Sequence, residues 1–310
     1  MKNFKKKPKI SEEASILTKR AKSEKVVYAF AFVLFAFYAV SIIYPLLYLL
    51  INSFQDAYTY TQNRVMGNAN PFALPEVWHF ENYVKAINIS VQDSQNNEVY
   101  MYMMFLNSIW YCGIAVCGQV FMSSVTGYVM AKYKFKAREF IYAIVIFSMT
   151  IPIVGTTGSM MKLVGDLGIY NSPLYVVVVS LGGLGFNFMV MYGFFKSVSW
   201  SYAEAVFLDG GGHFTAFFKV MLPQTKTLLI TLGIVAFIGT WNDYMTPLLY
   251  IPDYPTIASG LYRIKESATR NGDMPYYFAG LMFSVIPVLV IYICFSDTIM
   301  KNFSFGGLKG

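Results

Sequence analysis

One polar segment, residues 204–223, carries the side chains best suited to chemistry at a surface exposed to water. Glu204 and Asp209 are carboxylates that can accept hydrogen bonds and ion pairs, and three glycines, 210–212, follow directly. Glycine adopts positive φ without a Cβ clash, so these glycines predict a sharp reversal of the chain. The segment is therefore expected to present two carboxylates to something that grips it from the water.

Two short helices are expected on either side of the glycine turn. The first covers residues 200–208, and the second covers residues 214–221 with Phe217, Phe218 and Met221 on one apolar face. Proline cannot continue a helix comfortably, so Pro223 begins the next segment. The expected product is a compact helical hairpin that projects from the apolar segments around it.

Catalytic chemistry has little support in the rest of the chain. Its two histidines, His79 and His213, are isolated from any ligand or nucleophile at usable spacing. Residues 182–185 are rich in glycine but lack the lysine and hydroxyl residue of a phosphate-binding loop, and close helix packing is their simpler interpretation. Three cysteines lie in apolar stretches without spaced pairs and predict neither disulfide nor zinc site: Cys112, Cys117 and Cys294. We expect no catalytic residue, metal or cofactor on this chain.

The elements that position the hairpin are expected to be membrane helices. The chain has 310 residues, of which 56% are hydrophobic and 13% charged, whereas a soluble domain carries about 25% charged residues. Its apolar stretches approach the ~20 residues that cross a bilayer as helix, which satisfies its own backbone in lipid. The sequence predicts an all-α polytopic membrane protein with six transmembrane helices at about 26–52, 104–131, 138–161, 172–195, 225–250 and 278–299.

The positions of the cations predict how these helices are oriented. A basic tail, residues 1–25, precedes the first span, and a short tail, 300–310, follows the last. Of the 24 Lys and Arg residues, 18 fall on the side that carries both termini and six on the other. Because cytoplasmic loops carry the excess of cations, both termini and the coupling loop 199–223 are expected in the cytoplasm. The net charge of +7 thus reflects orientation and predicts no nucleic-acid partner.

Two segments are expected on the opposite side of the membrane. Residues 53–103 form a long loop, and its prolines and aromatic residues indicate a short ordered excursion. Residues 251–277 form a second segment, with an amphipathic helix expected near 256–268.

The spacing within 204–223 resembles that of permease subunits of binding-protein-dependent ABC importers. Their hallmark is Glu-Ala-Ala, three residues, Gly, nine residues, Ile, one residue and Leu-Pro. This chain keeps that spacing, with Val206 and Val220 in place of alanine and isoleucine. In that family the segment is the coupling helix, which docks into the ATP-hydrolysing subunit. The resemblance implies contacts with that subunit by Glu204, Ala205, Asp209, Gly210, Val220, Leu222 and Pro223.

Other matches resemble the carbohydrate importers of the maltose type, in particular the shorter of the two maltose permeases. They are Phe54, Leu74-Pro75 to Asn82-Tyr83, Asn107-Ser108, Gly182-Gly183, Trp241-Asn242 and the ending Gly306-Gly307-Leu308-Lys309-Gly310. The resemblance implies the permease architecture of type I ABC importers in a prokaryotic cell membrane. It also implies that Gly306, Gly307 and Lys309 make a second contact with the ATPase, although a frayed polar terminus is the alternative.

The same resemblance implies a set of partners and a cargo. They are a second homologous permease, two ABC ATPase subunits that hold ATP and Mg, an extracellular or periplasmic solute-binding protein, and a carbohydrate. A sugar path needs hydrogen-bonding groups and flat aromatic faces, and polar groups at membrane depth are costly unless they face protein or water. The candidates are Asn187, Trp241, Asn242 and Tyr111. Hydrogen bonds between helices are an equal alternative for each of them, and anchoring at the membrane interface is the commoner role of Trp241.

Two other functions stay open at this point. The same machine could carry a solute other than sugar, or the chain could act alone as an ion-coupled transporter or channel. Asp243 is the carboxylate that falls inside an expected span, and it lies near the outer surface. A transporter coupled to ions would place ionisable groups near the midplane, which weakens that second alternative.

Overall fold

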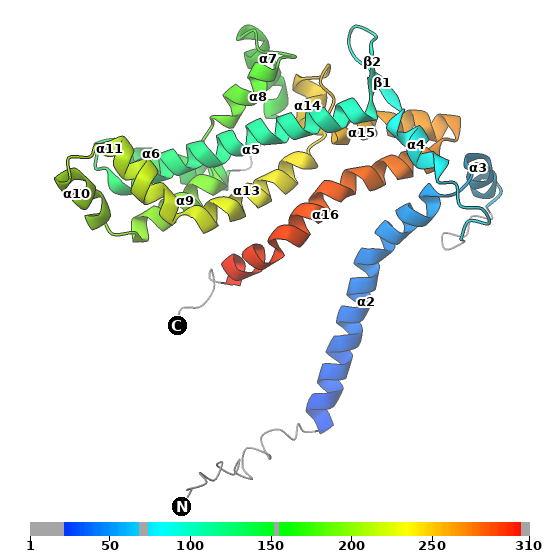
Figure 1. Ribbon diagram of the computed structural model, residues 1–310, viewed down its shortest axis with the longest axis horizontal. Coiled ribbons are helices and arrows are strands. Elements are labelled where there is room, and N and C mark those ends of the chain that lie inside the picture. Colours follow the sequence, from blue (N-terminus) through cyan, green and yellow to red (C-terminus); the bar gives the residue numbers. More distant parts are fainter. Residues whose placement is uncertain (1–21, 68–73, 152–154, 305–310) are drawn as a thin grey trace, which may run out of the picture.

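The computed structural model describes residues 22–67, 74–151 and 155–304, and these are almost entirely helical (Figure 1). Three helices are long and apolar enough to cross a membrane, and they are α2 (Lys22–Ser53), α5 (Met101–Lys132) and α16 (Met274–Ser304). They correspond to the first, second and sixth expected spans. A bent pair, His213–Gln224 and Lys226–Trp241, gives a fourth candidate if its 74° bend is treated as part of one span. The other expected spans are interrupted helices, so a count of six spans is not confirmed.

The expected span 138–161 is divided into α6 (Arg138–Thr150) and α7 (Thr156–Asp166). The residue after α6, Ile151, has extended backbone with φ −87° and ψ 119°. It precedes Pro152, and the ring of a proline disfavours helical geometry in the residue before it. A hydropathy pattern does not register this break, because the residues on both sides of it remain apolar.

The expected span 172–195 is divided into α8 (Pro173–Ser180) and α9 (Phe186–Ser197). The glycine-rich residues 182–185 separate the two helices and lie against α5. A Cβ atom on Gly183 would come within 2.8 Å of the backbone of Met122, and the Thr126 hydroxyl donates a hydrogen bond of 2.9 Å to the Gly183 carbonyl. These glycines therefore allow close helix packing, as the sequence suggested.

The expected span 225–250 is divided into α13 (Lys226–Trp241) and α14 (Met245–Tyr250). Asp243 lies in the break between them, and its carboxylate accepts a hydrogen bond of 3.1 Å from the backbone N–H of Thr246. A carboxylate at this position satisfies an unpaired N–H group at the start of α14. The break places Asn242 and Asp243 at the end of α13, where they can face a cavity.

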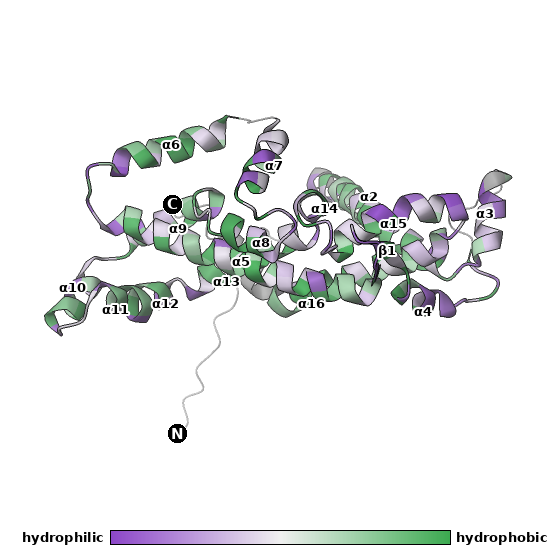
Figure 2. Ribbon diagram, turned by 90° about the horizontal axis from the view of Figure 1, so that it is seen from above, coloured by the Kyte–Doolittle hydropathy of each residue, from purple (hydrophilic) through white to green (hydrophobic). Residues whose placement is uncertain are grey.

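One end of the molecule is polar, as Figure 2 shows in the colouring of α3, α4 and α15. It contains α3 (Ala57–Val65), α4 (Glu81–Ile87) and α15 (Ile257–Asn271). The strands β1 (Ser90–Gln92) and β2 (Glu98–Tyr100) pair antiparallel, with Val91 opposite Val99. The ordered excursion and the amphipathic helix expected from the sequence are both present, and Thr256 and Ser259 form a capping box at the start of that helix.

The hairpin lies at the opposite end of the bundle from this polar end (Figure 1). It consists of α10 (Ser201–Leu208), α11 (His213–Thr215), a π-helical turn at Ala216–Met221 and α12 (Leu222–Gln224). The central helix α5 runs between the two ends and packs against α8, α9 and α13. The hairpin is therefore connected to the polar end by continuous packed helices.

Candidate functional site

The glycine turn of the hairpin has the geometry that the sequence predicts. Gly210 has φ +80°, in the left-handed region that favours glycine. The Gly211 N–H donates a hydrogen bond of 2.8 Å to the Val206 carbonyl, which closes the end of α10. A Cβ atom on Gly211 would lie 2.5 Å from the Val206 side chain, whereas one on Gly212 would meet open space. Two of the three glycines are thus needed for this reversal, for different reasons.

The side chains expected to contact an ATPase lie on the outside of the hairpin. Most of them are exposed, namely Glu204, Ala205, Asp209, Gly210 and Pro223, while Val220 and Leu222 are half-buried. Two large apolar side chains at the tip are also exposed, with Leu208 at 88% and Phe214 at 81%. The tip therefore combines carboxylates with apolar groups, which suits a docking surface.

The inner side of the hairpin packs on α5 and α9. Phe217 and Met221 are buried together with Met191 and Phe195, and the Phe217 ring centroid lies 4.9 Å from that of Tyr128. Phe218 was expected on the same face but is 46% exposed. It follows Phe217 directly and points about 100° away around the helix axis. The apolar face is consequently narrower than the sequence indicated.

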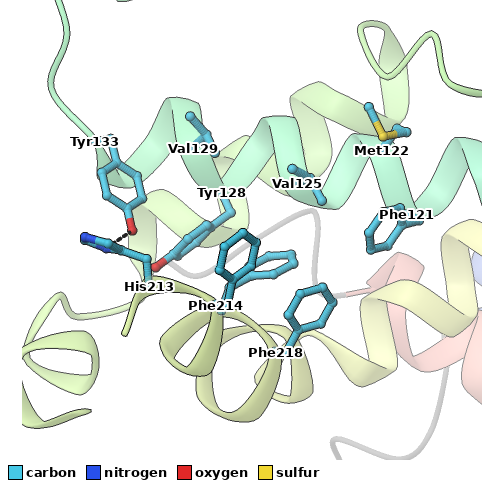
Figure 3. A pocket seen from close by; sticks show the side chains of 10 residues that line it. Phe121, Met122, Val125, Tyr128, Val129, Tyr133, His213, Phe214 and Phe218 are labelled. Carbon is cyan, nitrogen blue, oxygen red and sulfur yellow. Dashed lines mark hydrogen bonds between the residues drawn. The ribbon is translucent and has the colours of Figure 1, made fainter. Parts of the chain in front are cut away.

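His213 is not isolated, in contrast to the expectation from the sequence. Its Nδ1 lies 2.8 Å from the hydroxyl of Tyr133, at the end of α5 (Figure 3). Its ring also packs against Phe207, with centroids 4.9 Å apart, and Tyr133 packs against Trp200 at 5.7 Å. The contact joins residues 80 positions apart, so no local spacing could have revealed it. His213 fastens the tip of the hairpin to the helix beneath it.

Trp241 and Asn242 lie together at the polar end of α13, but their environments differ. Trp241 is 3% exposed, its Nε1 donates a hydrogen bond of 2.9 Å to the Ser284 carbonyl, and it stacks on Phe237. It is a core residue that joins α13 to α16, not an anchor at the membrane interface. Asn242 is exposed and, with Trp241, lines a cavity of about 270 Å³.

Aromatic and polar side chains surround this cavity. Tyr244 and Tyr262 stack with ring centroids 4.6 Å apart, and Lys265 and Ser284 also line the wall. Flat rings beside an amide, an ammonium and a hydroxyl are suited to a sugar, whose ring faces stack and whose hydroxyls form hydrogen bonds. Sequence reasoning missed Tyr244 and Tyr262, because α15 is brought to α13 only by the tertiary fold.

Tyr111 and Asn187 stand in different relations to this cavity. Tyr111 is buried, lines a separate cavity of about 120 Å³ with Gln119 and Tyr175, and has its hydroxyl 3.5 Å from the Asp243 carboxylate. Asn187 lies at the start of α9 and lines neither cavity. The fold thus brings three of the four candidates to one region and leaves Asn187 apart.

Some predicted features lie elsewhere. Gly306, Gly307 and Lys309 fall outside the described residues. Cys112 is buried, whereas Cys117 and Cys294 are exposed on helix surfaces, and all three are free thiols. Over residues 22–67, 74–151 and 155–304 there is no group of three or more His, Cys, Asp or Glu residues that could hold a metal ion.

Comparison with known proteins connects this architecture to a family. The family described as "Binding-protein-dependent transport system inner membrane component" matches residues 123–304. The chain is 27% identical to a diacetylchitobiose uptake system permease protein of Streptomyces coelicolor, over 93% of this chain and 91% of the relative. It is 24% identical to a maltodextrin transport system permease protein of Streptococcus pneumoniae, over 96% of this chain and 99% of the relative.

The fold is also similar to that of solved structures. A chain of a bacterial ABC transporter involved in the import of the acidic polysaccharide alginate superposes with a TM-score of 0.72 at 21% identity. The match covers 90% of this chain and 98% of that chain. A chain of a bacterial alginate ABC transporter, in complex with a periplasmic protein that holds an alginate pentasaccharide, superposes with a TM-score of 0.60 at 15% identity.

Proposed function

The chain belongs to the family of binding-protein-dependent transport system inner membrane components, and we propose that it forms, with a second homologous permease, the path for an oligosaccharide. It is a membrane permease subunit without catalytic activity of its own. ATP and Mg are held by two partner ATPase subunits, and the sugar is delivered by a solute-binding protein outside the cell membrane.

The similarity to permeases of oligosaccharide uptake systems is the observation that carries this proposal. Relatives named for diacetylchitobiose, maltodextrin and arabinooligosaccharides match the chain over 89% of its length or more. The cavity beside Trp241 and Asn242 supports the same conclusion, because it combines stacked tyrosines with hydrogen-bonding groups. We assign Asn242, Trp241 and Tyr111 to the substrate path, and Asn187 to a position along it nearer the hairpin.

The hairpin is the proposed contact with an ATPase subunit. Glu204, Asp209 and Gly210 lie on its exposed side, as a docking surface requires. The excess of cations on the side that carries both termini supports a cytoplasmic location of the hairpin, where ATP is available. Gly306, Gly307 and Lys309 are proposed as a second contact with the ATPases.

The link from the hairpin to the path is continuous. Thr225, fully buried at the 74° bend, donates its hydroxyl to the Leu222 carbonyl at 2.7 Å, and its own carbonyl accepts the first hydrogen bond of α13 from Leu229. The 16 residues of α13 span about 24 Å at 1.5 Å per residue. They end at Trp241 and Asn242, so displacement of the hairpin by an ATPase would move the cavity wall. This is the mechanical basis that we propose for alternating access.

Reconstitution tests the proposal and separates it from two alternatives. The chain, its partner permease and both ATPases would be placed in proteoliposomes with the cognate binding protein. We expect ATP hydrolysis stimulated by the binding protein, together with uptake of a labelled oligosaccharide. Uptake only of an amino acid or polyamine would replace the sugar assignment, and transport by the isolated chain driven by an ion gradient would overturn the whole proposal.

A further inference from the structure

An apolar groove of about 440 Å³ lies between α5 and the hairpin (Figure 3). On one wall Phe121, Val125 and Val129 recur at every fourth residue of α5, so they share one face of that helix. Phe214 and Phe218 form the opposite wall, and the rings of Phe121 and Phe218 are nearly parallel with centroids 6.3 Å apart. No carboxylate, lysine or arginine lines the groove. Its occupant must therefore be apolar over most of its length.

One polar group in the groove has no partner. Tyr128 lines the groove, is 3% exposed, and its hydroxyl forms no hydrogen bond within the described chain. Figure 3 shows the ring between α5 and the hairpin, beside His213. A buried hydroxyl without a partner is costly, whereas an acceptor entering the groove would satisfy it. The occupant should consequently carry an acceptor, such as an ester or carboxyl oxygen, next to its apolar part.

Cations surround the end of the groove that Tyr133 closes. Lys134 and Lys136 follow Tyr133 in the chain, and Lys219 follows Phe218 on the hairpin. All three side chains are exposed, and none forms an ion pair with a described residue. The neighbouring Lys132 and Arg138 are already engaged, with the Val198 carbonyl and with Glu139. Three free ammonium groups at one end of an apolar groove are complementary to a ligand with an anionic head.

We propose that this groove binds an anionic phospholipid of the leaflet on the hairpin's side of the membrane. One acyl chain packs between Val129 and Phe218, the ester carbonyl accepts from the Tyr128 hydroxyl, and the phosphate lies at Lys134 and Lys136. Basic sites between helices on the cytoplasmic side are suited to acidic head groups. The bound chain lies between α5 and the hairpin and so stiffens their contact. That effect on transport rests on the proposed function, whereas the lipid site itself does not.

The lipid site is tested on the complete importer, purified from its membrane and exchanged into nanodiscs of phosphatidylcholine with or without phosphatidylglycerol. Val129→Trp fills the groove, and Ile109→Trp places the same side chain on an exposed position of α5 outside it. Native mass spectrometry should find about tenfold less bound phosphatidylglycerol in Val129→Trp, since exclusion of two methylene groups accounts for such a factor. Ile109→Trp should retain it. Equal retention in both variants would overturn the proposal.

Two further measurements identify the ligand. Lys134→Gln combined with Lys136→Gln should abolish the preference for phosphatidylglycerol over phosphatidylcholine, whereas Lys162→Gln on α7 should leave it unchanged. A photoreactive residue at Val129 should cross-link to phospholipid. Cross-linking to the partner permease, or to a free fatty acid alone, would contradict the assignment. Co-purification of the ATPases with each variant verifies assembly. Phospholipid binding without any association with the ATPases would refute the proposed function and leave the lipid site standing.

Discussion

The two ends of this molecule are held together by different forces. At the polar end, side chains and backbone from separate segments are tied by hydrogen bonds. Asn82 is the clearest case, because its amide donates to the Ser53 carbonyl at 2.9 Å and to the Gln55 carbonyl at 2.8 Å. Ser108 on α5 accepts from the Ile257 N–H at 2.8 Å, and Asn107 donates to the Pro255 carbonyl. Hydrogen bonds of this kind fix both distance and direction.

The hairpin end is held mainly by apolar and aromatic contacts. Phe217 and Met221 pack on Tyr128 and Phe195, and one side-chain hydrogen bond, between Tyr133 and His213, joins the hairpin to α5 in the described chain. Apolar contact has no preferred direction, so such an interface can shift by small amounts without losing its stabilisation. The comparison indicates a rigid polar end and a hairpin that can move as one body. Each prediction below tests one side of this difference.

The largest effect is expected at the glycine turn. Gly210→Val should abolish most uptake while the ATPases still hydrolyse ATP, because a β-branched residue at φ +80° is strained and the hairpin loses its shape. Gly212→Val is the matched control, since Gly212 has φ −92° and open space around its Cβ position. Uptake and ATP hydrolysis are measured in the same proteoliposomes. Normal uptake in Gly210→Val would remove the hairpin from the coupling mechanism.

The next effect concerns the apolar contact beneath the hairpin. Phe217→Ala should cost about 3–5 kcal/mol of local stability, because a buried ring is replaced by a cavity. Phe214→Ala should change it by less than about 0.5 kcal/mol, as expected for an exposed site, since Phe214 is 81% exposed. Hydrogen exchange of residues 201–224 in the assembled transporter measures both. Equal protection in the two variants would show that the apolar contacts do not hold the hairpin.

The sequence predicted the hairpin more completely than the path. Three glycines and a proline determine a turn locally, so Gly210 and the helix ends could be located without tertiary information. The breaks in the expected spans were missed, because Ile151 and residues 182–185 are apolar or small and leave the hydropathy unchanged. The burial of Trp241 depends on Ser284, and the fastening of His213 depends on Tyr133. Both partners are distant in sequence and follow only from the packed fold.

Asn82→Ala tests the rigid end. Removal of the amide leaves the Ser53 and Gln55 carbonyls without their donor at a site where Asn82 is 2% exposed. We expect a loss of about 1–3 kcal/mol, measured by thermal unfolding of the transporter in nanodiscs. Asn88→Ala is the control, because Asn88 is exposed and its amide bonds only to Val84 of its own helix. A difference too small to measure would imply that the polar end is held by its apolar contacts after all.

The smallest expected effect is a dependence on pH that is confined to the polar end. Burial opposes ionisation of Asp253, but hydrogen bonds from Ser94 and Asn171 and the charge of Arg263 hold the pKa of this carboxyl below its usual value. A carboxyl with a lowered pKa contributes stability above its ordinary value of about 3.9, and that contribution is lost as the pH falls through its value in the folded protein. The loop between β1 and β2 should therefore lose protection below about pH 4.

Hydrogen exchange of residues 90–100, corrected for intrinsic rates, measures this loss between pH 5 and 3. Asp253→Asn should weaken the loop at pH 5 and remove part of its pH dependence. The remainder is assigned to Asp93, whose pKa hydrogen bonds from Asn97 also lower. The hairpin should show no parallel change, because Glu204 and Asp209 form no side-chain hydrogen bond or ion pair with any described residue. A loss of protection at both ends over the same pH range would mean that the molecule responds as one unit, and the distinction between its two ends would fail.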